Sequence, residues 1–193
     1  DAGNAATWPF PVVTRVVRDA APVRVVRGRA EGLVDAFVEA GQALAAEGAR
    51  VAVTGRTLEK LQKTVAEIER RGGTALPVQC EVKSLASLQA CVKTVVDHFG
   101  GLNILVNNAQ EVPNGELFNV SDEAFEAGFQ SGPLATMRLM KLCHPYLKGD
   151  GSIVNLPSSA TKRWDMSGYG AYAAVKDAIR ELTRAAACEW GKD

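Results

Sequence analysis

Short β-type runs alternate with amphipathic helical patterns from Arg50 onward, and this alternation limits the fold more than any other feature of the sequence. The run RVAVT at 50–54 is followed by apolar residues at helical spacing over 58–68, and Gly72 and Gly73 then end the pattern. Strands that alternate with helices in this way build a parallel sheet through right-handed crossovers. The sequence therefore predicts an α/β fold.

The same order of elements continues along the rest of the chain. Further strands are predicted at Ala75–Cys80, Leu102–Val106 and Ser152–Leu156, and further helices over 85–99, 121–147 and 169–190. Because the carboxyl ends of parallel strands meet along one edge of the sheet, a ligand site is expected at that edge.

Residues 1–49 do not share this pattern. Arginines interrupt valine-rich runs there, and no lysine occurs before Lys60. The segment is predicted to contain one or two strands, followed by a helix from about Glu31 to Glu47.

The composition is that of an ordinary globular protein. The 193 residues are 47% hydrophobic and 23% charged, which predicts a single domain over 1–193 with a core that needs no disulfide or metal. Lysine and arginine number 22, as do aspartate and glutamate, so the net charge of zero gives no reason to expect nucleic acid or an anionic membrane as partner. No apolar stretch is long enough to span a bilayer. A small-molecule ligand is expected instead.

The cysteines and histidines indicate no metal site. The four cysteines are isolated in largely apolar surroundings, without the spacing of metal ligands; they are Cys80, Cys91, Cys143 and Cys188. They are interpreted as reduced core residues of a cytoplasmic protein. His98 and His144 lie in helical patterns without companion ligands and are expected to be surface or core histidines.

The strongest chemical signal is the pattern Tyr172-Ala-Ala-Val-Lys176, preceded thirteen positions earlier by Ser159. Residues four apart share one face of a helix, so the Lys176 ammonium is expected near the Tyr172 phenol. A neighbouring cation favours the phenolate and suits the tyrosine for acid–base work near neutral pH. Ser159 follows a strand end and could donate to the same substrate oxygen. YxxxK is also common by chance, in which case the tyrosine merely packs.

Several motifs in order resemble the short-chain dehydrogenase/reductase family from about Arg50 to Asp193. They are VAVTGRTLEKL, LNILVNNA, GSIVNLPSSA and YGAYAAVK, followed by AIRELTRAAACEWG. The resemblance implies a doubly wound, Rossmann-like three-layer αβα fold that uses NAD or NADP. It also implies that Ser159 orients the substrate oxygen, that Tyr172 is the acid/base, and that Lys176 tunes the tyrosine and binds the nicotinamide ribose.

The resemblance extends to the cofactor site. Asn107 would brace the central strands beside the cofactor, and Ala109 would line the nicotinamide side. Glu81 and Val82 match an Asp-Val pair that lies at the adenine in the family, with Glu in place of Asp.

The end of the strand at 50–54 bears on the choice between the two cofactors. An acid there would bind the ribose hydroxyls of NAD and repel a 2′-phosphate, but the sequence has Thr54-Gly55-Arg56. Arg56 could pair with the phosphate, so NADP(H) is preferred over NAD(H). The alternative is an exposed arginine near a turn.

The glycine-rich turn of the family is altered. Its nearest match keeps Gly28 and Gly32, which would approach the pyrophosphate at a helix N-terminus, but Val34 replaces the third glycine and Arg27 the threonine. Glu31 adds a negative charge where the phosphates would sit. Weakened cofactor binding is therefore expected.

Two other departures concern the long helix and the chain ends. The family places an asparagine in the helix over 121–147, and anchoring on Met137-Arg138-Leu139 puts Gly132 at that position, beside Ser131. The family also continues with further elements after the last helix, and this sequence begins without Met. The sequence is therefore expected to be a fragment.

Three functions are compatible with these patterns. The first is an NAD(P)-dependent oxidoreductase that interconverts a small alcohol and ketone, with Tyr172 as acid/base. The second is a catalytically impaired relative that acts in association or regulation, and the third is an epimerase or dehydratase with bound NAD. Small residues of the last helix (Ala178, Ala185, Ala186) would permit close helix packing in a homodimer or homotetramer, or within one chain.

Overall fold

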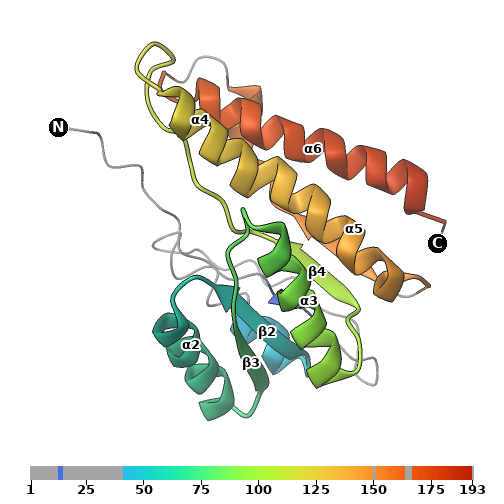
Figure 1. Cartoon of the computed structure of the whole chain (residues 1–193). Coiled ribbons are helices and arrows are strands. Elements are labelled where there is room, and N and C mark those ends of the chain that lie inside the picture. Colours follow the sequence, from blue (N-terminus) through green and yellow to red (C-terminus); the bar gives the residue numbers. More distant parts are fainter. Residues whose placement is uncertain (1–12, 15–40, 150, 164–166, 193) are drawn as a thin grey trace.

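The structure is a computed structural model that describes residues 13–14, 41–149, 151–163 and 167–192. Its centre is a sheet with the strand order β3-β2-β1-β4-β5. Figure 1 labels β2, β3 and β4 of this sheet. In that order the strands are Thr74–Gln79, Arg50–Gly55, Val13–Thr14, Ile104–Asn107 and Ser152–Asn155. The pairs β2–β3 and β4–β5 are parallel, so the sequence correctly predicted their direction and their bounds to within two residues.

The two-residue strand β1 makes the sheet mixed rather than wholly parallel. Val13 pairs with Val53 on one side and with Val106 on the other, and both pairings are antiparallel. Strands β2 and β4 present backbone donors and acceptors toward the gap between them, and a short extended segment of either direction can pair with them. The expectation of one or two strands within residues 1–49 is met by β1; the helix predicted over 31–47 is described only at 41–46.

Helices cover both faces of the sheet, which confirms the predicted α/β architecture. Helix α2 (Leu58–Arg70) and the helical residues 41–46 lie against one face. Helices α3 (Leu85–Phe99) and α5 (Ala135–Leu147) lie against the other, and α6 (Gly170–Trp190) packs beside them (Figure 1).

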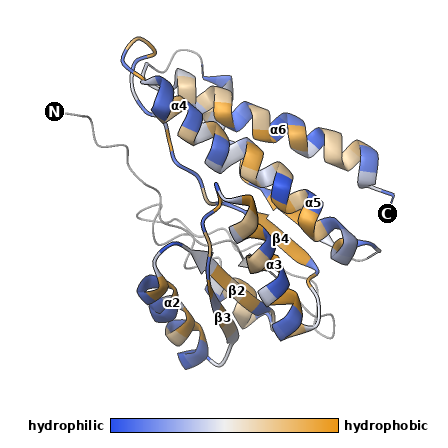
Figure 2. Ribbon diagram, viewed as in Figure 1, coloured by the Kyte–Doolittle hydropathy of each residue, from blue (hydrophilic) through white to orange (hydrophobic). Residues whose placement is uncertain are grey.

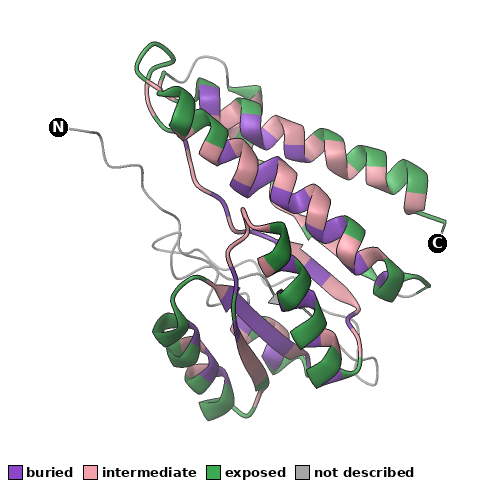
Figure 3. Cartoon of the chain, viewed as in Figure 1, coloured by how far each residue is buried: buried purple, intermediate pink, exposed green. Residues whose placement is uncertain are grey.

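Each face has its own core because side chains alternate along a strand. Val51 and Val53 of β2 point toward α2, where they meet Leu61, Val65 and Ile68. Ala52 points the other way, into the larger core that α3 and α5 share. The helices that cover the sheet bury mainly apolar residues and expose mainly polar ones, as hydropathy and burial show (Figures 2 and 3).

The helix predicted over 121–147 is interrupted. It begins as α4 (Asp122–Phe129), widens into a π-helical segment at Gln130–Leu134, and continues as α5. Pro133 lies in that segment, and proline has no N–H to donate to the carbonyl four residues earlier. The hydrogen-bond ladder therefore widens there, which apolar periodicity did not predict.

Two further findings concern the cysteines and membrane spans. Cys80, Cys91 and Cys143 are buried thiols as expected, but Cys188 is exposed, because it lies on the outer side of α6. Among the described residues, no helix is long and apolar enough to cross a membrane.

Candidate active site

Tyr172 and Lys176 lie on the first two turns of α6. The Lys176 ammonium is 5.8 Å from the centroid of the Tyr172 ring. The same nitrogen donates a 2.7 Å hydrogen bond to the carbonyl of Leu156, just after β5, which fixes the lysine between the helix and the sheet. The structure thus brings together the lysine and tyrosine that the sequence pairs.

Lys176 is 8% exposed, which is unusual for a lysine. Burial removes water from the ammonium and lowers the pKa of Lys176 to about 8. The group can therefore change its charge within about one pH unit of physiological pH.

Ser159 is placed on the loop between β5 and α6. It is exposed and begins a short 3-10 helix, Ser159–Lys162, whose preceding residue Ser158 accepts a hydrogen bond from the Ala160 N–H. Arg180 of α6 donates to the Thr161 hydroxyl and holds this loop against the helix. No hydrogen bond joins Ser159 to Tyr172 within the described part of the chain.

An asparagine pair braces the carboxyl ends of β4 and β5. The amide of Asn107 donates to Asn155 Oδ1 at 2.8 Å, and the amide of Asn155 donates to the Thr183 hydroxyl of α6 at the same distance. Asn107 thus joins β4 to β5 through its side chain. Asn155 bonds to side chains on both sides because β4 and α6 both present polar atoms to it.

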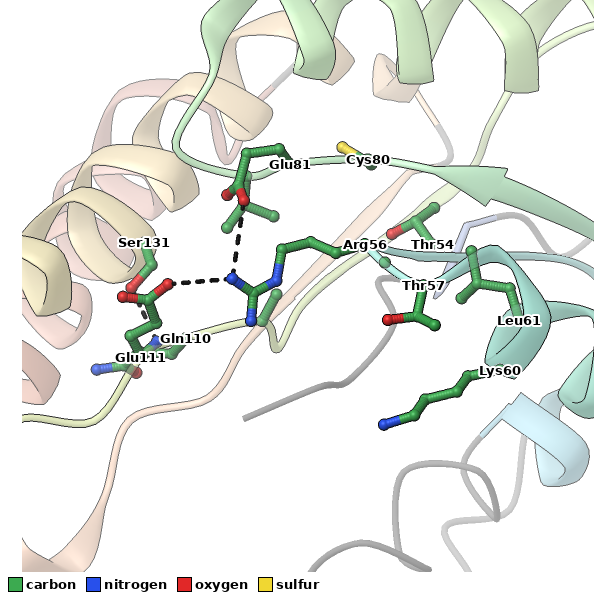
Figure 4. Close-up of a pocket in the computed structure, with 13 residues that line it drawn as sticks. Thr54, Arg56, Thr57, Lys60, Leu61, Cys80, Glu81, Gln110, Glu111 and Ser131 are labelled. Carbon is green, nitrogen blue, oxygen red and sulfur yellow. Dashed lines mark hydrogen bonds and ion pairs between the residues drawn. The ribbon is translucent and has the colours of Figure 1, made fainter. Parts of the chain in front are cut away.

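A pocket of about 70 Å³ lies where β2, β3 and β4 end (Figure 4). The predicted cofactor residues Arg56, Glu81, Val82 and Ala109 all line it. Asn107 lines a smaller adjoining cavity of about 10 Å³, which shares Val82 and Ala109 with it. The pocket also includes residues that the sequence analysis missed: Lys60, Gln110, Glu111 and Ser131.

Charged side chains of both signs meet in this pocket. The Arg56 Nη1 atom lies 3.5 Å from a carboxylate oxygen of Glu111 and 3.9 Å from one of Glu81, as the dashed lines in Figure 4 show. Lys83 lies 3.0 Å from the same Glu111 oxygen. The sequence showed no acid next to Arg56, but the fold brings two from other strand ends. Glu111 lies two residues after the NNA motif, which was the available signal.

Comparisons with known proteins decide the family. Residues 38–193 match the sequence profile of a family described as enoyl-(acyl carrier protein) reductase. The chain is 39% identical over 158 residues to a 12alpha-hydroxysteroid dehydrogenase of a Clostridium species, and 33% identical over 187 residues to the short-chain reductase protein NovJ of Streptomyces niveus. These alignments cover 78% and 96% of this chain, and 61% and 70% of the relatives. The chain belongs to the short-chain dehydrogenase/reductase family.

A solved structure of this family has the same fold. A short-chain dehydrogenase of Burkholderia cenocepacia, solved in complex with NADP, superimposes with a TM-score of 0.75 and 31% identity. The match covers 80% of this chain and 64% of that one. The predicted Rossmann-like fold is therefore confirmed.

Gly132, where the family resemblance places an asparagine, lies in the π-helical segment against Gln110. A Cβ atom at position 132 would meet Val175 Cγ1 at 3.0 Å, and Cδ and Nε2 of Gln110 at 3.3 Å. Gln110 is 5% exposed, and neither of its side-chain polar atoms finds a hydrogen-bond partner among the described residues. The buried amide of Gln110 thus packs directly against the backbone of Gly132.

The residues present fit a nicotinamide dinucleotide. Asn108 Nδ2 and the amide of Gln110 are buried polar atoms that lack a partner within the described ranges, and such atoms are commonly completed by water or a ligand. Arg56 and Lys60 supply positive charge at the pocket wall. The pocket lies outside the carboxyl ends of the strands, beside the gap where the strand order reverses, which is the usual dinucleotide position in such sheets.

Some residues considered in the sequence analysis lie outside the described residues. They include the predicted phosphate-binding glycines, Gly28 and Gly32. Within the described part of the chain, no group of histidine, cysteine and acidic side chains is arranged to hold a metal ion.

Proposed function

We propose that the protein is an NAD(P)-dependent oxidoreductase that interconverts a small alcohol and a ketone, with Tyr172 as the acid/base. The observation that carries this proposal is the buried Lys176 ammonium beside the Tyr172 ring, on a helix packed against β5 and the π-helical segment. Relatives in the family are named as dehydrogenases and reductases, which supports the same reaction class.

The proposed chemistry divides between cofactor and protein. The nicotinamide, when bound, supplies or accepts the hydride at the substrate carbon. Tyr172 gives a proton to the substrate oxygen in reduction and takes it back in oxidation. The ammonium of Lys176 favours the phenolate, and Ser159 donates a hydrogen bond to the same oxygen.

We assign the pocket at the ends of β2, β3 and β4 to the adenosine part of the cofactor. Glu81 and Val82 lie at the adenine, Asn107 and Ala109 lie toward the nicotinamide, and Arg56 pairs with a 2′-phosphate. Because Arg56 is a cation on the pocket wall, NADP(H) is preferred over NAD(H).

Substitution of Tyr172 tests the acid/base role. With a panel of small ketones and NADPH, Tyr172→Phe is expected to lower kcat by at least about 10²-fold, because the proton donor is lost. The affinity for NADPH should stay within about twofold. Tyr169→Phe is a matched control, since its ring lies one turn earlier, 6.2 Å from that of Tyr172. Retained turnover in Tyr172→Phe would remove the tyrosine from this role.

A fluorescence titration with NADPH and NADH separates this function from that of a catalytically impaired relative. An oxidoreductase binds at least one of them below millimolar concentration, and Arg56→Ala weakens NADPH more than NADH. Absence of binding to either would reject the oxidoreductase and favour the alternative role in association or regulation.

We also propose a homodimer or homotetramer that uses α6. Ala185 of α6 is exposed, and a small side chain there permits close approach of a second helix. Sedimentation equilibrium measures the state directly, and Ala185→Arg should shift an oligomer toward the monomer. A wild-type monomer at all concentrations would reject the assembly.

A further inference from the structure

Glu111 is an acidic residue placed inside the cationic corner of the pocket, which is an unexpected position if the pocket takes a phosphate. We propose that Glu111 sets the selectivity between NADP(H) and NAD(H), because its carboxylate competes with the 2′-phosphate for Arg56. This inference rests on the proposed cofactor site. It makes Glu111, which no family motif singles out, a specificity-determining residue.

The carboxylate of Glu111 already acts as the anion of this corner. One of its oxygens lies 3.0 Å from Lys83 Nζ and 3.5 Å from Arg56 Nη1. Glu81 reaches the same Arg56 nitrogen only at 3.9 Å, so Glu111 is the nearer of the two acids. A 2′-phosphate that approaches Arg56 must therefore displace Arg56 from Glu111 or lie beside a negative charge.

Glu111 is held in place, whereas Arg56 can move. The side chain of Glu111 is 20% exposed and that of Arg56 is 44% exposed. The backbone N–H of Glu111 donates to the Ser131 hydroxyl at 2.8 Å, and that hydroxyl donates to the carbonyl of Ala127 at 2.7 Å. The start of the π-helical segment thus fixes Glu111, and Arg56 is the partner that rotates toward a ligand.

Lys83, the second cation of this corner, is also constrained. Its backbone carbonyl accepts a hydrogen bond from Arg138 of α5 at 3.1 Å, and its side chain is 31% exposed. Lys83 therefore stays with Glu111 when Arg56 leaves. Lys60 lines the opposite wall, and no carboxylate is within ion-pair distance of it among the described residues. Arg56 and Lys60 are then the two cations free to face a phosphate, with Glu111 opposing them.

Removal of the charge of Glu111 tests the competition. A dianionic phosphate about 5 Å from a carboxylate in a largely aqueous pocket is repelled enough to change affinity by roughly tenfold. Glu111→Gln, which keeps the shape of the side chain, should therefore tighten NADPH roughly tenfold and change NADH by less than about twofold. Glu111→Asp keeps the charge and should keep most of the wild-type selectivity. Glu69→Gln, on the exposed side of α2, is the matched control and should change neither affinity.

Fragment probes locate the effect at the phosphate without any turnover. By calorimetry, Glu111→Gln should bind adenosine 2′-monophosphate more tightly than the wild type does, and adenosine 5′-monophosphate equally. The gain should shrink in high salt, because counter-ions screen the repulsion in an open pocket.

The outcomes separate this inference from the function on which it rests. If the wild type binds NADPH and Glu111→Gln binds it equally or more weakly, Glu111 only orients Arg56 and the competition is refuted, while the proposed function stands. Equal gains for NADPH and NADH would also refute it, since the effect would not depend on the 2′-phosphate. If no variant binds a dinucleotide or a fragment, the proposed cofactor site fails and this inference fails with it.

Discussion

The contact between Gly132 and Gln110 predicts that the two positions are energetically coupled. An asparagine at 132 begins with a Cβ only 3.0 Å from Val175 and 3.3 Å from the Gln110 amide, and its own amide must enter the space that Gln110 occupies. Overpacking of a tight site costs about 1–3 kcal/mol. We therefore expect Gly132→Asn to lower the free energy of unfolding by about 2 kcal/mol.

Shortening the neighbour should relieve this penalty. Gln110→Ala removes the amide whose Cδ and Nε2 lie against position 132, and leaves the contact with Val175. In the double variant, the cost of Gly132→Asn should fall below about 1 kcal/mol, which gives a favourable coupling of at least about 1 kcal/mol. Urea denaturation of the wild type, both single variants and the double variant completes the cycle.

Gly170→Asn is the control for the substitution at Gly132. A Cβ at Gly170, the first residue of α6, meets no atom within 4 Å, so Gly170→Asn should change stability by less than about 0.5 kcal/mol. If the effects of the two substitutions add to within about 0.5 kcal/mol, Gln110 does not fill the space beside Gly132 and the reasoning is wrong.

Three other predictions follow from single contacts. Burial lowers the pKa of Lys176 from 10.5 to about 8, so the unfolded chain binds more protons between these values, and native stability should rise with pH through this window. Measured by urea denaturation, the free energy of unfolding of the wild type should rise by about 2–3 kcal/mol relative to that of Lys176→Met between pH 7 and pH 10. A difference between the two proteins that stays constant with pH would contradict this prediction. Ser84 caps α3 by accepting from the Ser87 N–H, and Ser84→Ala should cost about 1 kcal/mol in the same assay. Asn155→Ala deprives the buried Asn107 amide of its acceptor and should cost about 2 kcal/mol, and a loss below 0.5 kcal/mol would show that water replaces the bond.

Most helices and strands could be predicted because the spacing of apolar residues, and the glycines that end a helix, are local features of the sequence. The helix at Leu85–Phe99 was predicted to the residue, since its apolar side chains recur at helical spacing and Gly100 follows in the left-handed region, at φ 76°. Strand β2 was predicted one residue short. The antiparallel β1 could not be predicted in direction, because pairing with β2 and β4 depends on a gap that exists only in the folded sheet.

The pocket could be predicted only in part. Arg56, Glu81 and Ala109 follow three different strands, and parallel topology brings such ends to one edge whatever the details of packing. Gln110 and Glu111 were missed, because their contacts are made with a helix segment about twenty residues further along the chain. Sequence spacing alone does not specify a contact of that kind.

A single irregularity in a helix connects these missed residues. Pro133 interrupts the ladder that would have made 122–147 one regular helix, and the π-helical segment turns Ser131 and Gly132 toward the end of β4. Ser131 binds the backbone of Glu111, and Gly132 leaves space for the amide of Gln110. The position of Glu111 and that of the buried amide of Gln110 therefore depend on the geometry of one helical turn. A change at Pro133 that restored regular α-helix would rotate both contacts away together, so the electrostatics of the pocket and the packing beside α6 are not independent properties of this protein.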